Sequence, residues 1–231
     1  MAVILIARAI RPPQTCRLSI AARTGSAPSP ILIGMMALAL VLAATLQRCD
    51  TGNTYDMRMC WSRQDAAARD RLHAAYDGVA GEMRTLGIDL RPLAAAQVAW
   101  TTARDQTCDF AYLLYADGTI APQLALECDY RMTQARTQRL TELNAELRAR
   151  GAGQPEEPVS QAADRELNRI YRLYRARVTP QQSAALAAAE LAWISYRDKA
   201  CAIEGGTCMT QLEKERVTEL EAAWVGEPFW M

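Results

Sequence analysis

Apolar side chains recur along this 231-residue chain at the three- and four-residue spacing of helices that bury one face. The first clear stripe consists of Leu72, Tyr76, Val79, Met83 and Leu86. Gly87 is placed to end this helix, and Pro92 suits the first turn of a second one, which would run to about Cys108. A third helix, from about Pro122 to Arg148, presents Met132, Leu140, Leu143 and Leu147.

The second half repeats this pattern. Ser160 is a candidate N-cap for a stripe of Ala163, Leu167, Ile170 and Tyr174. Thr179 and Gln182 form a capping box around Pro180, and the next stripe is Leu186, Ala189, Trp193, Tyr196 and Ala200. Leu212, Arg216 and Leu220 belong to a last helix. No run of alternating β-branched residues indicates a sheet, so the sequence predicts an all-α fold.

An internal repeat relates the two halves. Ala96, Ala99, Trp100, Arg104, Asp105 and Cys108 recur at identical spacing as Ala189, Ala192, Trp193, Arg197, Asp198 and Cys201. Downstream, Cys128, Arg136 and Leu140 correspond to Cys208, Arg216 and Leu220. We therefore expect two tandem three-helix copies, the first at 45–150 and the second at 160–231. The glycine- and proline-containing segment 151–159 would link them.

Residues 1–44 have the layout of an export signal. An apolar run from Ile31 to Leu46 follows an acid-free stretch with four arginines, and Ala43 and Ala44 offer a cleavage point. The run is shorter than the ~20 residues that span a bilayer, so we expect a cleaved signal peptide rather than a membrane anchor. Its removal leaves 22 basic and 26 acidic side chains, a net charge of −4. Such a mildly acidic body argues against a nucleic-acid partner.

Six cysteines follow the predicted signal, an even number that favours disulfides in an exported protein. They are Cys49, Cys60, Cys108, Cys128, Cys201 and Cys208. Six cysteines allow fifteen pairings, and local order suggests that neighbours pair in sequence. A zinc site is not expected, because the chain has no CxxC pair and its one histidine is His73.

Between Cys108 and Cys128 the first copy carries a 13-residue insertion relative to the second. Asp117 and Gly118 indicate a turn, and the segment combines acidic and aromatic side chains at Asp109, Tyr112, Tyr115 and Asp117. A disulfide-framed acidic loop could plug the cleft of a basic enzyme. Alternatively, the loop covers its own core, which is the commoner use of such segments.

The repeated tryptophans, Trp100 and Trp193, lie on apolar stripes, and core packing is expected for them. Each is followed by an adjacent arginine–aspartate pair, Arg104–Asp105 and Arg197–Asp198. Because neighbouring helix residues point to different faces, we expect each pair to splay apart and to tie helices together across their interfaces.

These residues resemble the lysozyme inhibitor LprI family. The family's pattern opens with two cysteines that enclose a threonine, an acidic residue and a methionine. Here this element is matched by Cys49, Thr54, Asp56, Met57 and Cys60. Its next element is matched by Asp164, Leu167, Asn168 and Tyr171, and both Trp–Arg–Asp–Cys blocks match its central motif. The first copy departs from the pattern, with Arg69 and His73 in place of Asp164 and Asn168, and the second copy lacks the opening cysteine pair.

The resemblance implies an exported, periplasmic or secreted protein-binding module that inhibits lysozyme-type muramidases by steric occlusion. The alternative is a structural or assembly protein of the cell envelope with no enzyme target. The sequence shows no nucleophile motif, phosphate loop, metal-ligand spacing or paired catalytic carboxylates in a recognisable setting. We therefore predict a protein that is not an enzyme and needs no cofactor.

Overall fold

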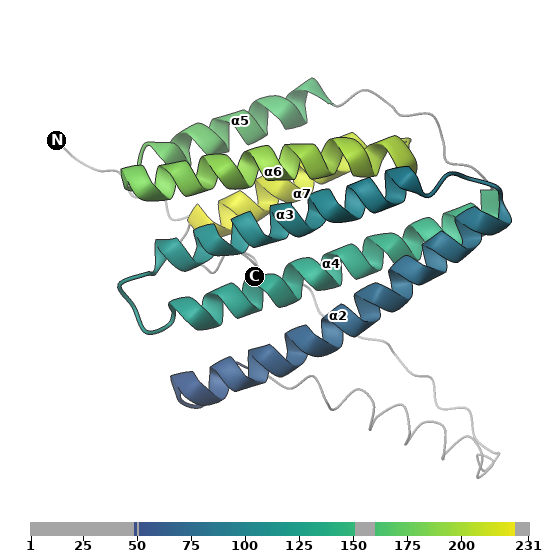
Figure 1. Cartoon of the computed structure of the whole chain (residues 1–231). Coiled ribbons are helices and arrows are strands. Elements are labelled where there is room, and N and C mark those ends of the chain that lie inside the picture. Colours follow the sequence, from purple (N-terminus) through teal and green to yellow (C-terminus); the bar gives the residue numbers. More distant parts are fainter. Residues whose placement is uncertain (1–48, 50, 151–159, 225–231) are drawn as a thin grey trace, which may run out of the picture. The chain divides into compact units, whose positions relative to one another are not determined.

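The computed structural model describes residue 49 and the ranges 51–150 and 160–224. The predicted export segment 1–44 and the linker 151–159 lie outside these residues. Six helices and no strand occur in the described part, which confirms the all-α prediction. They are α2 (Thr54–Thr85), α3 (Arg91–Leu114), α4 (Ala121–Arg150), α5 (Gln161–Arg175), α6 (Pro180–Glu204) and α7 (Cys208–Trp224) (Figure 1).

Local capping explains where several helices begin and end. The Thr179 hydroxyl accepts the Gln182 backbone N–H at 3.3 Å, and the Gln182 side chain accepts the Thr179 N–H at 2.9 Å, so the predicted capping box is formed. Gly87 follows α2 with a φ of 70°, a conformation that glycine adopts without the steric penalty of a β-carbon. Ser160 makes no side-chain cap bond; its backbone N–H instead donates to the Thr210 hydroxyl of α7 at 3.0 Å.

Two helices of the first copy are longer than their stripes indicated. The α2 helix begins at Thr54, where the Asn53 side chain accepts the backbone N–H groups of Tyr55 and Asp56. The α3 helix continues past Cys108 to Leu114, which leaves 115–120 as the turn before α4. Most of the insertion is therefore helical rather than a loop, because the segment from Phe110 to Leu114 contains no helix breaker and can pack against the second copy.

The two copies meet through their equivalent central helices. α3 packs along α6, while α2 packs on α4 in the first copy and α5 on α7 in the second (Figure 1). Gln182, near the start of α6, donates to the Leu113 carbonyl near the end of α3 at 3.0 Å, so the two helices run antiparallel. The described helices belong to one compact unit. One buried apolar cluster extends through both copies and includes Trp100, Phe110, Leu140, Trp193 and Leu220.

Three disulfides join neighbouring cysteines in the order suggested by the sequence. They are Cys49–Cys60, Cys108–Cys128 and Cys201–Cys208. The second and third occupy equivalent repeat positions, and each ties the central helix of its copy to the next helix. Within the described residues, no helix is long and apolar enough to cross a membrane.

Candidate functional site

The Trp–Arg–Asp motif of the first copy forms a small stacked cluster. Trp100 is buried, and the Arg104 guanidinium carbon lies 5.1 Å from its ring centroid. Arg104 donates to Asp105 from Nε at 3.0 Å and from Nη2 at 2.6 Å. Its Nε also lies 3.3 Å from the carboxylate of Asp129 on α4. One arginine thus connects its own helix to the next one.

The second copy repeats this cluster. Arg197 lies over Trp193 at 5.3 Å and donates to Asp198 at 2.9 and 2.7 Å. It also pairs with Glu213 of α7, whose side chain is fully buried. The expectation that each arginine and its aspartate splay apart is therefore wrong, because stacking on the tryptophan one turn earlier brings the guanidinium beside the adjacent aspartate. The expected tie between helices is formed by the two arginines, because Arg104 also reaches Asp129 on α4 and Arg197 reaches Glu213 on α7.

A second pair of equivalent arginines is buried, at Arg136 and Arg216. Arg216 Nε donates to Glu190 at 2.8 Å, and Arg136 Nε donates at 3.3 Å to Gln97, which occupies the same repeat position as Glu190. The first copy therefore has a neutral amide where the second has a carboxylate. The repeat in the sequence relates the two arginines to each other. It does not indicate their partners, because Gln97 and Glu190 lie on other helices.

Arg136 finds its counter-charge in the other copy. Its Nη1 lies 3.6 Å from Glu204 of α6 and donates to the Tyr196 hydroxyl at 3.3 Å. Arg139, one turn later on α4, pairs with Glu204 at 2.7 Å and with Glu215 of α7 at 3.0 Å. Burial raises the pKa of Glu204, and the two arginines oppose that shift. These contacts form an ionic seam between the copies.

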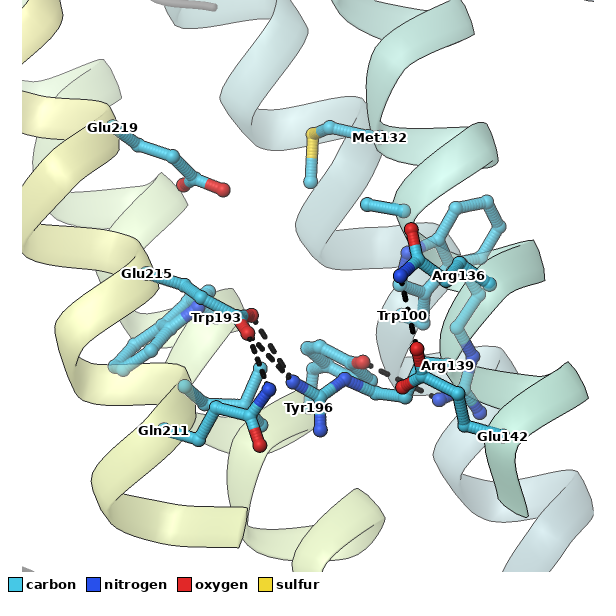
Figure 2. Close-up of a pocket in the computed structure, with 13 residues that line it drawn as sticks. Trp100, Met132, Arg136, Arg139, Glu142, Trp193, Tyr196, Gln211, Glu215 and Glu219 are labelled. Carbon is cyan, nitrogen blue, oxygen red and sulfur yellow. Dashed lines mark hydrogen bonds and ion pairs between the residues drawn. The ribbon is translucent and has the colours of Figure 1, made fainter. Parts of the chain in front are cut away.

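The seam lies at a cleft of about 190 Å³. Figure 2 shows α4 on one side, carrying Met132, Arg136, Arg139 and Glu142, and α7 on the other, carrying Gln211, Glu215 and Glu219. Trp100, Trp193 and Tyr196 also line the cleft. Arg136 and Arg139, which line the cleft, are already paired with carboxylates of the second copy. We therefore interpret the cleft as part of the contact between the two copies.

The carboxylate of Asp129 has an unusual environment on the first copy's side. Burial raises its pKa to about 6, opposed by Arg104 and Arg69 and reinforced by Asp65 and Asp105. Asp65 is buried and pairs with Arg69 at 2.7 Å. In the described part of the chain, no group of His, Cys, Asp and Glu side chains could hold a metal ion.

The sequence points to four acidic and aromatic residues in the insertion. They are exposed near the end where α3 joins α4. Asp109 and Tyr112 lie on α3, whereas Tyr115 and Asp117 lie in the turn before α4, and all four are exposed. We refer to these four residues as the tip. The sequence placed all four in a loop, whereas the structure places only the last two there.

The base of the tip is held by the rest of the protein. The Cys108–Cys128 disulfide joins α3 to α4 below it. Phe110 is fully buried and makes an edge-on contact with Tyr174 of α5, at a centroid distance of 6.3 Å. The Gln182 side chain bonds to the Leu113 backbone from the second copy. The insertion therefore covers the core with one face and exposes the tip on the other. Covering the core, which is one of the two roles considered from the sequence, leaves the other face free for the second role, binding a partner.

Comparison with known proteins places this architecture in a family. A family model described as lysozyme inhibitor LprI matches residues 34–140 and 157–220, which cover most of each copy and, before the first copy, residues 34–44. No curated protein matches the chain. A crystal structure of an uncharacterised protein from Burkholderia thailandensis is similar with a TM-score of 0.60 and 20% identity, covering 85% of this chain and 96% of that one, which shows a shared fold. Because the family model matches most of the sequence, the chain belongs to the lysozyme inhibitor LprI family.

Proposed function

We propose that this chain is an exported envelope protein that binds a lysozyme-type muramidase and inhibits it by blocking its substrate cleft. Membership of a lysozyme inhibitor family supports a muramidase as the partner. The three disulfides support an oxidising compartment outside the cytoplasm. The signal-like layout of residues 1–44 supports export.

The proposed inhibitory surface is the tip. The main support for it is that the disulfide Cys108–Cys128 and the bond from Gln182 to the Leu113 carbonyl hold the segment that bears the tip. A partner-binding segment gains affinity when it is ordered before binding, because less conformational entropy is lost in the complex. The tip combines two tyrosines, which often anchor protein interfaces, with two aspartates that complement a basic partner. Two of its four residues lie in the turn that joins α3 to α4, at one end of these two helices.

The experiment is a binding titration of the oxidised protein against a muramidase, comparing wild type with the double variant Tyr115→Ala, Asp117→Ala. Both side chains are exposed, so the variant should fold normally. Loss of an aromatic anchor and a charge at an interface centre is expected to weaken binding by about 30-fold or more. The matched control is Tyr55→Ala, Asp70→Ala, which removes an exposed tyrosine and aspartate from α2.

The control should bind as wild type does. Equal affinities for wild type and the tip variant would discard the tip as the binding surface, while leaving muramidase binding itself intact. If no muramidase binds the wild-type protein, the inhibitor proposal fails, and the envelope structural or assembly role becomes the leading explanation.

A further inference from the structure

The α7 helix ends beside the cleft that it forms with α4, which we call the α4–α7 cleft. Glu219 of α7 lines this cleft, and α7 ends five residues later at Trp224. Figure 2 shows Glu219 across the cleft from Met132 of α4, while Gln211, from the first turn of α7, lies toward the other end. The chain therefore leaves α7 at the Met132 end of the cleft.

Residues 225–231 follow α7 with the sequence VGEPFWM and lie outside the described part of the chain. Gly226 and Pro228 both disfavour a helix, so the sequence predicts that the chain changes direction here. Three large apolar residues come next: Phe229, Trp230 and Met231. Burying such side chains against apolar groups is more favourable than leaving them in water, so the segment favours a nearby surface that can accept them.

The size and lining of the α4–α7 cleft suit one indole ring. An apolar cavity of about 150 Å³ holds one benzene molecule, so the cleft of about 190 Å³ has room for a single aromatic side chain. Apolar groups line part of it, from Met132, Ala135, Trp193 and Leu212. The carboxylates of Glu142 and Glu215 also line it, and a carboxylate can accept the N–H that a buried indole needs to bond. Phe229 has no such donor, so Trp230 is the better match.

The segment is long enough to return to the cleft. From Trp224 back to Glu219, the distance along α7 is about 8 Å at ~1.5 Å per residue. The axes of packed helices lie about 8–10 Å apart, which is the scale of the step from α7 toward α4. The chain from Trp224 to Trp230 can span about 20 Å when extended, so Trp230 can reach a position between Glu219 and Met132.

We propose that residues 225–231 fold back into the α4–α7 cleft and place the Trp230 side chain there, against Met132 of α4. The helices that flank the cleft pack mainly on other helices, α4 on α2 and α3, and α7 on α5 and α6. Across the cleft they are joined by the ion pair of Arg139 with Glu215. The docked segment adds an apolar contact from the second copy to the first and covers their joint. This contact lies within one molecule, so it does not depend on muramidase binding.

The direct test is nuclear magnetic resonance of the oxidised protein, with the methionine methyl groups labelled with a carbon isotope. The wild type is expected to show nuclear Overhauser contacts between the Met132 methyl group and the Trp230 indole. Trp230→Ala should abolish these contacts and shift the Met132 methyl resonance, because the neighbouring aromatic ring is removed. The Met59 methyl group, which is exposed on α2, is the internal control and should not shift.

A second test asks whether the cleft itself holds the segment. Ala135 of α4 is exposed and lines the cleft, so Ala135→Arg fills the cleft without disturbing the core. A chymotrypsin-type protease accepts large apolar side chains, so it cleaves after Phe229 or Trp230 when the segment is undocked. Because cleavage follows the population of the open form, Ala135→Arg should raise the rate of this cleavage about tenfold or more, as followed by mass spectrometry. Ala66→Arg, at an exposed position on α2, is the matched control and should leave the rate unchanged.

Absence of contacts between Met132 and Trp230 in the wild type would overturn the proposal, and so would equal cleavage rates for wild type and Ala135→Arg. If the Met132 methyl group shows no contact with the segment but shifts when a muramidase is added, the cleft serves that partner and the docking proposal is wrong. The variant at Tyr115 and Asp117 is read separately, in the muramidase titration. Failure of the docking therefore cannot be confused with failure of the proposed function.

Discussion

Replacing Glu190 with Gln tests whether the buried arginines of the two copies are neutralised in different ways. Arg216 is completely buried, and Glu190 accepts bonds from both its Nε and its Nη2. Its other carboxylate partner, Glu219 at 2.9 Å, has a side chain that is 41% exposed. Glu190→Gln keeps the shape and one acceptor oxygen but removes the buried negative charge.

Removing one member of a buried ion pair costs about 3–5 kcal/mol when the remaining charge is uncompensated. Because the amide still accepts a bond and Glu219 remains, we expect a loss of about 2–3 kcal/mol in the free energy of unfolding. At about 2–4 °C per kcal/mol for a chain of this size, the melting temperature should fall by roughly 5–10 °C. Urea unfolding of the oxidised protein, followed by circular dichroism, measures the loss in the free energy of unfolding directly.

The equivalent position in the first copy supplies the comparison. Gln97→Glu adds a carboxylate beside Arg136, which already has Glu204 at 3.6 Å, so its effect should be within about 1 kcal/mol. The double variant Glu190→Gln, Arg216→Met should recover much of the loss, because no fully buried charge is left unpaired and Glu219, which loses Arg216, has a side chain that is 41% exposed to water. If Glu190→Gln unfolds within about 0.5 kcal/mol of wild type, the reasoning about a buried uncompensated charge is refuted.

Two further predictions concern pH and the disulfides. Because the pKa of Asp129 is raised to about 6, the folded protein binds a proton more tightly than the unfolded chain. The carboxyl therefore favours folding at pH 4, and this contribution of about 2–3 kcal/mol is lost as pH rises to 7. Asp129→Asn should remove this pH dependence of the free energy of unfolding. If urea unfolding shows that the free energies of wild type and variant differ by the same amount at pH 4 and at pH 7, the prediction is contradicted. Replacing Cys108 and Cys128 with Ala opens a bridge that spans 20 residues and should cost about 3 kcal/mol in the same assay; an unchanged unfolding midpoint would show that this bridge adds no stability.

Helix type and the internal repeat were predictable from the sequence because they depend on local patterns. The capping box at Thr179 and the apolar stripes specify a helix and its buried face without reference to distant residues. Cysteine pairing between neighbours was suggested by the same local order. By contrast, a stripe does not say which other helix it meets, so the pairing of α3 with α6 emerged only in the structure.

The contacts of the arginines could not be read from spacing for the same reason. Arg136 takes its counter-charge from Glu204, 68 positions away in the other copy, and no motif links the two. The arginine–aspartate neighbours were expected to point apart, but stacking on a tryptophan one turn away redirected the long arginine side chain. The turn signal at Asp117 and Gly118 predicts a loop for the insertion, but the residues before that signal are compatible with a helix, and Phe110 packs in the core against Tyr174.

The most direct test of the central claim is a titration of the oxidised protein against a panel of lysozyme-type muramidases, measuring complex formation and residual cell-wall lysis in the same samples. If the protein inhibits by occupying the substrate cleft, lysis should fall in proportion to the fraction of enzyme bound and reach its minimum at saturation. Absence of binding across the panel, or binding that leaves lysis unchanged at saturation, would contradict inhibition by steric occlusion.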